Sequence, residues 1–387
     1  MPASPSPPRG AVREVATTFL RIGLTAFGGP AAHIAIMRHE LVERRKWVSE
    51  AHFLDLLGAT NLIPGPNSSE MTMHLGFVRA GWRGLLAGGV AFLLPAMLIV
   101  LGIAWAYVEY GATPAAGWLL YGIKPVIIPL IALALWSLGR AAVKGPVTVA
   151  VGIGALALDL LGVNFVAVLL GGGAAVMLLD NARRLRHRPG ATLALPLPML
   201  GGGLGGLAAS SATGFSLWGM ALIFLKIGAL LYGSGYVLFA YMQADLVQAN
   251  GWLTEQQLLD AIAIGQFTPG PLSASATFVG YILGGVPGAL LATAALYAPA
   301  FLVVALSNPL IPRIRNSRWA SGFLDGVNVA ALALMIAVTW ELGQAALVDP
   351  FTLVTGAIAA VVLVRWKLSS AWVVLFGAAM GLLSALA

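Results

Sequence analysis

The chain has 387 residues, of which 59% are hydrophobic and only 10% are charged, and its mean hydropathy is +0.88. These are too few polar side chains to coat a water-soluble globule of this length. The absence of cysteine excludes disulfides, cysteine-ligated metals and thiol catalysis. The net charge of +7 comes mostly from short basic loops between apolar segments, which indicates membrane topology rather than nucleic-acid binding.

The first 13 residues are rich in proline and lack the apolar core and cleavage site of a signal peptide. We therefore predict a disordered tail over residues 1–13 and no cleaved leader. Apolar runs of helix-spanning length follow, and none alternates in the manner of a β-barrel strand. They include residues 84–107, 118–138, 146–161 and 165–179. We expect an all-α, polytopic membrane protein.

The sequence contains one internal repeat. FLRIGLTAFGGP, from Phe19, aligns with FLKIGALLYGSG, from Phe224, at an offset of 205 residues. The same offset pairs Trp47 with Trp252 and Pro-Gly-Pro 64–66 with Pro-Gly-Pro 269–271. After this motif the second repeat lacks one residue, and an offset of 204 pairs Pro95 with Pro299 and Trp136 with Trp340. A register held for so long indicates a duplication. We predict two repeats, over residues 14–182 and 217–387, joined by a basic cytoplasmic loop and linker over residues 183–216.

The charges of matched loops differ in sign between the two repeats. In short loops Lys and Arg mark the cytoplasmic side. The first repeat has basic loops at 38–46, 79–83, 140–144 and 183–188, with Glu109 and Asp159 in the loops between. In the second repeat Asp245, Glu255, Glu341 and Asp349 stand at basic positions, and Arg313, Arg315, Arg318, Arg365 and Lys367 at acidic ones. The repeats are therefore predicted to have inverted topology.

Inversion requires an odd number of crossings in each repeat. The pattern supplies about five transmembrane helices plus a pair of short helices, at residues 51–64 and 67–80 in the first repeat. About 13 residues of helix extend roughly 20 Å, against roughly 30 Å of hydrocarbon, so we predict a re-entrant hairpin. This count places the N-terminal tail outside although it carries Arg9 and Arg13, and the interruption FGGP at 27–30 leaves that sidedness open.

Polar residues follow the helix-breaking motif at once in LIPGPNSSEM, residues 62–71. Broken backbone within a membrane is tolerated only against protein or a water-filled cavity. Pro66 is acceptable at a helix start, Asn67 or Ser68 can cap that helix, and its free N–H groups and positive dipole end favour an anion. The motif therefore predicts an anion site.

The second motif has its own polar residues, Thr268, Ser273 and Ser275. Two half-helices can thus approach one midplane site from opposite sides, as in inverted-repeat transporters. The alternative is that each motif is only a tight turn between two crossing helices.

These motifs also resemble a known family. FGGPAAHI at 27–34, LVERRKW at 41–47, NLIPGPNSSEM at 61–71 and the HLGF that follows are similar to the chromate ion transporters, the long two-domain form of the CHR superfamily. The resemblance covers essentially the whole chain. It implies a bacterial inner-membrane carrier, not an enzyme and without cofactor or metal, that exports chromate and confers chromate resistance, driven by the proton gradient or membrane potential. Its partners would be the oxyanion, protons and the lipid bilayer, with a homodimer as a candidate assembly.

Two matched cations, Arg21 and Lys226, lie within apolar helices, where an unpaired charge costs roughly 3 kcal/mol or more. They suit a dianion, and the alternative is that they snorkel to an interface. Lys124 matches Asn328 and is a further candidate for a polar lining. The full set of predicted substrate-binding residues is Arg21, Gly28, Gly29, Pro64, Gly65, Pro66, Asn67, Ser68, Ser69, Lys124, Lys226, Thr268, Pro269, Gly270, Pro271, Ser273, Ser275 and Asn328.

Glu70, His74 and His33 are the candidates for proton coupling. Glu70 lies in the first turn after the motif, where it either caps the helix dipole or exchanges protons, and His74 follows one turn later on the same face. His33 lies near the basic loop, which favours a structural role. His33 and Glu70 have no counterpart in the second repeat, which reads GSG at 233–235 where the first reads GGP at 28–30, so the half that holds the coupling residue stays open.

Two other functions compete with chromate export. A sulfate or molybdate permease would recognise the same charge and tetrahedral shape, which the sequence does not distinguish. An intramembrane lipid-phosphate enzyme is the alternative of another class, but no zinc, nucleophile-elbow or phosphate-loop motif is present. A lipid or sterol scaffold would not require two broken helices facing each other.

Overall fold

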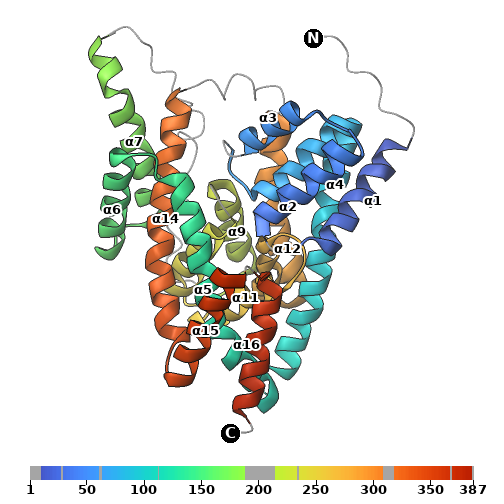
Figure 1. The fold of residues 1–387 in the computed structure, drawn as a ribbon, viewed down its shortest axis with the longest axis vertical. Coiled ribbons are helices and arrows are strands. Elements are labelled where there is room, and N and C mark those ends of the chain that lie inside the picture. The colour runs from blue at the N-terminus through green and yellow to red at the C-terminus, as the bar shows by residue number, and fades with distance from the viewer. Residues whose placement is uncertain are drawn as a thin grey trace.

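The computed structural model describes residues 10–27, 29–60, 63–111, 113–187, 214–232, 235–307, 318–366 and 368–385. All regular structure within these ranges is helical (Figure 1). The elements of the first repeat are α1 (Ala11–Thr25), α2 (Gly29–Arg38), η1 (His39–Arg44), α3 (Glu50–Thr60), α4 (Asn67–Tyr110), α5 (Pro114–Ala142), α6 (Pro146–Leu160) and α7 (Phe165–His187). Those of the second are α9 (Leu217–Leu230), α10 (Val237–Met242), η3 (Gln243–Ala249), α11 (Glu255–Phe267), η4 (Leu272–Ala274), α12 (Ser275–Ser307), α14 (Arg318–Ala346), α15 (Pro350–Trp366) and α16 (Ser370–Ser384).

Both first helices are broken where the sequence predicts it. In the first repeat α1 ends at Thr25 and α2 begins at Gly29, whose φ of 79° suits glycine. In the second repeat α9 ends at Leu230 and α10 begins at Val237. We call these interruptions the first break and the second break. Gly28, Gly233 and Ser234 lie outside the described residues, as do residues 1–9 of the predicted tail and 188–213 of the predicted linker.

The predicted pair of short helices is present in both repeats. In the first repeat α3 is joined to α4 through Pro64-Gly65-Pro66, and α4 departs from helical geometry at Ala80 and Gly81. A methyl group on Gly76 would lie 2.2 Å from the carbonyl oxygen of Gly84, which shows that the chain folds back on itself there. The second repeat does the same, with the departure at Gly284 and Gly285 of α12. Each Pro-Gly-Pro is thus the tip of a helical hairpin, and we call residues 64–66 the first tip and 269–271 the second tip.

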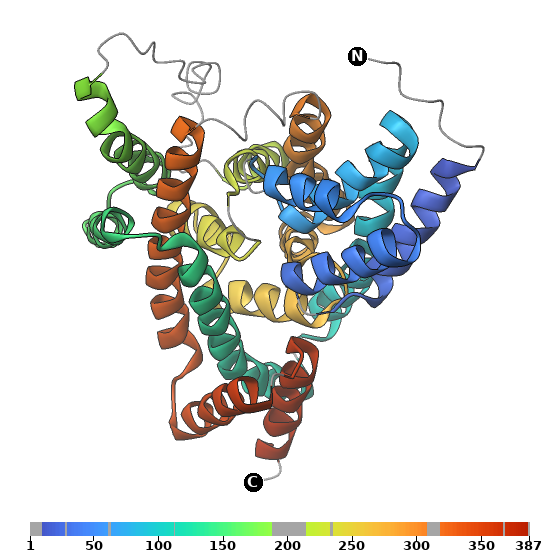
Figure 2. The same ribbon diagram turned by 45° about the horizontal axis from the view of Figure 1, so that its top comes forward.

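The matched long helices run in opposite directions. α5 rises from the lower end of the molecule, whereas its counterpart α14 descends from the upper end, in both views of Figures 1 and 2. Among the described residues, four helical segments are long and apolar enough to cross a membrane, and the other apolar helices, such as α6, α15 and α16, are shorter. The four are Asn67–Tyr110, Pro114–Ala142, Leu272–Ser307 and Trp319–Ala346. The chain is a polytopic membrane protein built from two inverted repeats.

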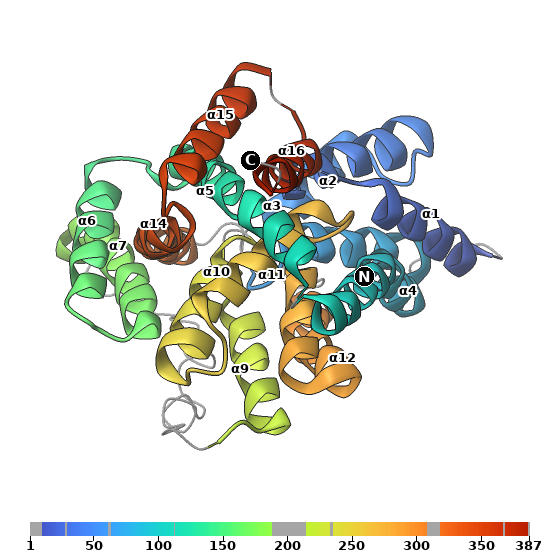
Figure 3. The same cartoon turned by 90° about the horizontal axis from the view of Figure 1, so that it is seen from below.

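Glycine lets helices approach closely within and between the repeats. A methyl group on Gly23 of α1 would lie 2.6 Å from the Phe92 carbonyl oxygen of α4, and one on the matched Gly228 of α9 would lie 2.1 Å from the Leu296 carbonyl oxygen of α12. Between repeats, Gly122 of α5 contacts α16 through the backbone of Gly377. Small residues at such contacts are typical of membrane helices. Figure 3 shows the resulting order, with α6 and α7 beside α14 and α1 on the opposite side.

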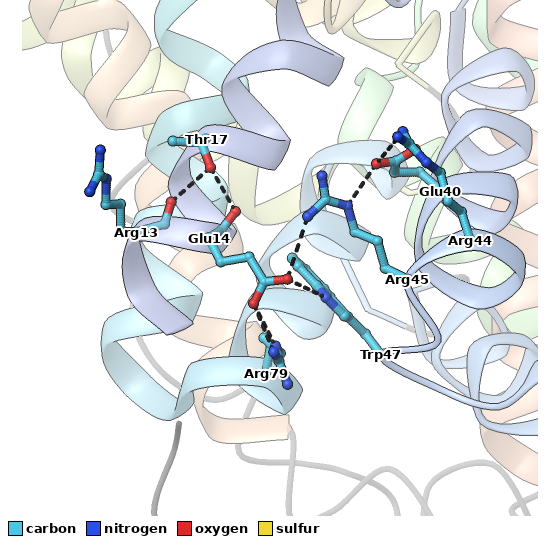
Figure 4. A network of polar contacts seen from close by, with 8 residues as sticks. All are labelled: Arg13, Glu14, Thr17, Glu40, Arg44, Arg45, Trp47 and Arg79. Carbon is cyan, nitrogen blue, oxygen red and sulfur yellow. Dashed lines mark hydrogen bonds and ion pairs between the residues drawn. The ribbon is translucent and has the colours of Figure 1, made fainter. Parts of the chain in front are cut away.

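A network of polar contacts centred on Glu14 lies at one end of the first repeat (Figure 4). Glu14 of α1 accepts hydrogen bonds from Arg79 at 2.7 Å and from the Trp47 ring nitrogen at 3.1 Å, and Arg45 lies 3.4 Å away. In the second repeat Gly219 stands at the position of Glu14, and Trp252 packs against it. The network therefore belongs only to the repeat with the basic loop. It holds α1 to the end of the hairpin.

Candidate functional site

The two tips dock reciprocally onto the two breaks. The Gly65 N–H donates to the Leu231 carbonyl oxygen at 2.7 Å, and the Gly270 N–H donates to the Ala26 carbonyl oxygen at 2.9 Å. Gly65 matches Gly270 and Ala26 matches Leu231 in the repeat alignment. Each tip therefore satisfies a carbonyl that the helix break of the other repeat leaves free. These two bonds are the reciprocal contacts expected of repeats related by a pseudo-two-fold axis.

A methyl group added to either tip glycine would meet a close neighbour. A methyl group on Gly270 would lie 2.9 Å from the Ala96 Cβ, and one on Gly65 would lie 2.3 Å from the Glu70 Oε1. The φ angles are 96° at Gly270 and 152° at Gly65. Glycine is required for both the bend and the close backbone approach.

Tyr297 of α12 connects the two hairpins. Its hydroxyl is hydrogen bonded to the Ser273 hydroxyl of the second hairpin, and the Ser69 side chain of the first hairpin lies near it without hydrogen-bond geometry. All three residues are buried. Tyr297 was not among the residues predicted from the sequence. The available signal was its match in the repeat alignment, where this polar residue stands opposite the apolar Leu93 of the first repeat. The N-terminal ends of both half-helices thus converge on one hydroxyl.

Several polar groups beside the tips have no hydrogen-bond partner among the residues that the structure describes. Glu70 is 0% exposed, and neither of its carboxyl oxygens has a hydrogen-bond partner among the described residues. The Ser69 and Ser275 hydroxyls are likewise buried and make no hydrogen bond there. Buried polar groups are nearly always satisfied, so a cluster of such groups indicates a place for a ligand or a proton. Glu70 folds back over Gly65, directly at the first tip.

The two histidine candidates lie at different places. His33 is fully buried, its Nε2 is 3.3 Å from the Ala26 carbonyl oxygen, and its ring packs edge-on against Phe92. Because a carbonyl oxygen only accepts, Nε2 carries the proton in this contact. That oxygen also receives the Gly270 N–H, so His33 supports the docking of the second tip. His74 is buried on α4, one turn beyond Glu70.

The predicted cations are not gathered at the tips. Lys226 forms an ion pair of 2.6 Å with Asp245 in its own repeat. Lys124 lies 3.4 Å from Asp260 of α11, which also accepts a 2.8 Å hydrogen bond from Tyr107. Arg21 is exposed on the outer surface of α1. A role for these three cations in substrate binding stays a prediction, and their surroundings fit a structural pair for both lysines and snorkelling for Arg21.

A cavity of about 270 Å³ lies next to the second break. Most of its lining residues are apolar, and the polar ones are Tyr232, Asn328, Ser321 and the Lys144–Asp325 ion pair of 2.6 Å, for which we call it the polar cavity. Asn328, one of the predicted site residues, therefore faces open space, whereas its match Lys124 does not line this cavity. A second cavity, of about 380 Å³, lies at the second tip and is bordered by Phe27, Thr268 and Pro269. Phe27 is the repeat counterpart of Tyr232, so each cavity includes the matched aromatic residue of one break.

The structure thus brings together the residues of the two tips and separates them from the predicted cations. Gathered at the tips are Pro64, Gly65, Pro66, Asn67, Ser68, Ser69, Glu70, Thr268, Pro269, Gly270, Pro271, Ser273 and Ser275. Gly29 begins α2 beside the first break, and Gly28 lies outside the described residues. Within the part of the chain that the structure describes, no three His, Asp or Glu side chains could hold a metal ion.

Comparison with known proteins shows the family to which the chain is similar. The family profile described as chromate transporter matches twice, over residues 13–177 and 218–382. A probable chromate transport protein of Synechococcus elongatus is 32% identical over 93% of this chain and 91% of its own. The chromate transport proteins of Cupriavidus metallidurans and Pseudomonas aeruginosa are 29% and 33% identical, over 96% and 87% of this chain and 93% and 82% of theirs.

No solved structure matches the chain. The two profile matches begin and end close to the boundaries of the predicted repeats. Each match covers 165 residues, so together they span more than three quarters of the 387-residue chain. The chain belongs to the chromate transporter family.

Proposed function

We propose that this protein is a secondary transporter that exports chromate across the bacterial inner membrane, driven by the proton gradient or the membrane potential, and that it confers chromate resistance. The family provides the substrate class. The observation that carries the proposal is the pair of reciprocally docked tips, beside which buried hydroxyls and a carboxyl have no hydrogen-bond partner in the described part of the chain.

The tips offer the chemistry that a tetrahedral oxyanion requires. Chromate presents only acceptor oxygens, and the Ser69, Ser273 and Tyr297 hydroxyls can donate to them once they turn from their present contacts. The positive ends of two half-helices point toward the same place and favour negative charge. A hydrogen bond to a charged group contributes about 1.5–3 kcal/mol, so a few donors suffice for specific binding.

The inverted repeats supply a route to alternating access. The polar cavity adjoins the second break at Tyr232, and the apolar cavity includes the matched Phe27 of the first break. If the repeats exchange their relative arrangement, a site at the tips opens first toward one cavity and then toward the other. We propose that Tyr232 and Phe27 are the side chains at which the two routes meet the site.

Sulfate is the strongest competing substrate because it shares the charge and the shape of chromate. Uptake into everted vesicles separates the two, because in such vesicles export from the cell becomes uptake. We expect saturable uptake of labelled chromate that excess unlabelled chromate abolishes and that sulfate reduces only at higher concentration. An electroneutral potassium–proton exchanger such as nigericin, which collapses the pH gradient, compared with valinomycin and potassium, which collapse the potential, identifies the driving force. Equal uptake of labelled sulfate would redefine the protein as a general oxyanion permease.

A further inference from the structure

We infer that Glu70 binds the oxyanion as a neutral carboxylic acid: its O–H donates a hydrogen bond to an oxyanion oxygen, and the group is protonated both when the site is empty and when it is loaded. Glu70 is then a substrate-binding residue and not a proton carrier. The inference rests on the proposed function, which it deepens by naming a further contact of the oxyanion and by stating that this contact exchanges no proton.

The first argument is the protonation state of the empty site. Glu70 is fully buried, and neither carboxyl oxygen has a hydrogen-bond partner among the described residues. None of the ion pairs formed within that part of the chain includes Glu70. An ionised carboxylate is costly to bury without a partner, so such a group takes up a proton and becomes neutral. Glu70 therefore has an O–H to donate before any oxyanion arrives.

The second argument is the position of the acid. A methyl group on Gly65 would lie 2.8 Å from the Glu70 Cδ, so the carboxyl lies against the first tip. The Gly65 N–H is bonded to the Leu231 carbonyl oxygen, and the next residue, Tyr232, lines the polar cavity. The acid is thus held where the first tip meets the second break. An oxyanion at the tips displaces the carboxyl from Gly65, and the turned side chain then presents its O–H to an oxyanion oxygen.

The third argument is the charge of the site. Lys124 and Lys226 are paired with aspartates, and Arg21 is exposed on α1. Neutral donors and the half-helix dipoles are therefore left to stabilise the two charges of the oxyanion. An ionised Glu70 would add a third negative charge, and like charges in a buried site oppose each other. The neutral acid adds a donor instead, and a hydrogen bond to an anion is stronger than one between neutral groups.

The fourth argument concerns the proton count on loading. The titratable side chains on the elements around the first tip are Tyr232 at the second break, Tyr297 of α12 and His74 of α4. At about pH 8 ordinary phenol and imidazole side chains are neutral, whereas an ordinary carboxyl is ionised. A carboxyl that is neutral at this pH both with and without oxyanion is therefore a distinctive expectation for Glu70.

The test compares two substitutions in purified full-length protein in liposomes, with the potential clamped by potassium and valinomycin and labelled chromate counterflow recorded at about pH 8. Glu70→Gln retains a donor N–H and never ionises, so its half-saturating chromate concentration should stay close to that of the wild type. Glu70→Met has a similar length but no donor, so that concentration should rise roughly 10- to 100-fold. Glu341→Met is the matched control and should leave it unchanged, because Glu341 accepts hydrogen bonds from Gln243 and Gln248 away from the tips.

Proton counting separates a donor from a proton carrier. In weakly buffered detergent solution at about pH 8, a pH electrode records the protons exchanged when chromate is added, and wild type and Glu70→Gln should exchange the same number. A proton exchanged by the wild type but not by Glu70→Gln would overturn the inference. So would a rise in half-saturating concentration in Glu70→Gln as large as in Glu70→Met, or no rise in Glu70→Met beyond that in Glu341→Met. Absence of chromate exchange in the folded wild type would instead defeat the proposed function.

A measurement on the unaltered chain covers the case in which both Glu70 variants fail to fold. In the infrared spectrum the C=O stretching band of a protonated carboxylic acid is separate from the bands of backbone amides and carboxylates. Between empty and chromate-loaded protein we expect this band to shift, because the hydrogen bonding of the acid changes, and no carboxylate band to be gained. An unshifted acid band, or an acid band replaced by a carboxylate band, would show that Glu70 is not a neutral donor to the oxyanion.

Discussion

Replacing Gly270 by alanine tests the docking of the second tip on the first break. The new methyl group would lie 2.9 Å from the Ala96 Cβ and 3.4 Å from the Gly23 carbonyl oxygen, both in helices that pack tightly. Ordinary carbon contacts are about 3.5–4.0 Å, so α4 would have to move or the tip would have to leave its place. We expect loss of the Gly270–Ala26 hydrogen bond together with lower stability.

The expected loss of stability in Gly270→Ala has two parts. A φ of 96° costs a residue with a side chain about 1–2 kcal/mol, and overpacking against α4 adds about 1–3 kcal/mol. Gly251→Ala is the matched control, because Gly251 also has positive φ but no atom stands within 4 Å of its added methyl group. The difference between the two variants, about 1–3 kcal/mol, isolates the contact at the tip.

Gly65→Ala should behave differently although it occupies the matched position. Its methyl group would meet the Glu70 carboxyl, the movable end of a side chain, before it meets the Ala300 Cβ at 3.1 Å. We therefore expect a smaller loss of stability and a larger loss of transport. Thermal unfolding of the purified variants in detergent measures the first quantity, and chromate uptake into vesicles measures the second. If Gly270→Ala unfolds at the same temperature as Gly251→Ala, the tip is not docked as described.

The remaining predictions concern the hydroxyls, the cations and the topology. Ser273→Ala and Ser69→Ala should each raise the half-saturating chromate concentration roughly 10- to 100-fold with little change in maximal rate. Ser68→Ala, one residue away, should leave that concentration unchanged. If the first two variants also leave it unchanged, the tips are only turns and do not bind the oxyanion. Lys226→Gln should reduce stability because it leaves the Asp245 carboxylate without its ion-pair partner, and adding Asp245→Asn to the same chain should restore stability. Arg21→Gln should keep normal transport. Loss of transport in Lys226→Gln and in Arg21→Gln at unchanged abundance would instead support dianion binding by the matched cations. Single cysteines at Ala249 and Ser317 should label from opposite sides, with Ala249 periplasmic, and labelling from one side would end the inverted-repeat interpretation.

The repeat made much of the fold predictable. Its register located both breaks and both hairpins, because proline and glycine at matched positions limit where a helix can continue. The structure confirms the breaks at 25–29 and 230–237 and the hairpins around the two tips. The ends of the hairpin helices differ from expectation by a few residues, and α1 begins at Ala11, within the predicted tail.

The sequence was less informative about which side chains meet. Because the second repeat lacks one residue after its tip, the alignment pairs Ser273 with Ser68 at an offset of 205 or with Ser69 at an offset of 204. In the structure it is Ser69 that lies near Tyr297, as Ser273 does. The cation pairs with Asp245 and Asp260 depend on helices that are distant in sequence, so spacing alone could not reveal them. Glu70 was identified, but its position over Gly65 depends on a rotamer that no pattern specifies.

A map of the full-length protein determined by electron cryo-microscopy with saturating chromate tests the central claim most directly. The account predicts density for a tetrahedral anion between the two tips, within hydrogen-bond distance of the Ser69 and Ser273 hydroxyls, with the Glu70 side chain turned away from Gly65. The same density should be lost in the Ser69→Ala, Ser273→Ala double variant. Chromate found instead beside Lys144 in the polar cavity, with Glu70 still covering the first tip, would contradict the account.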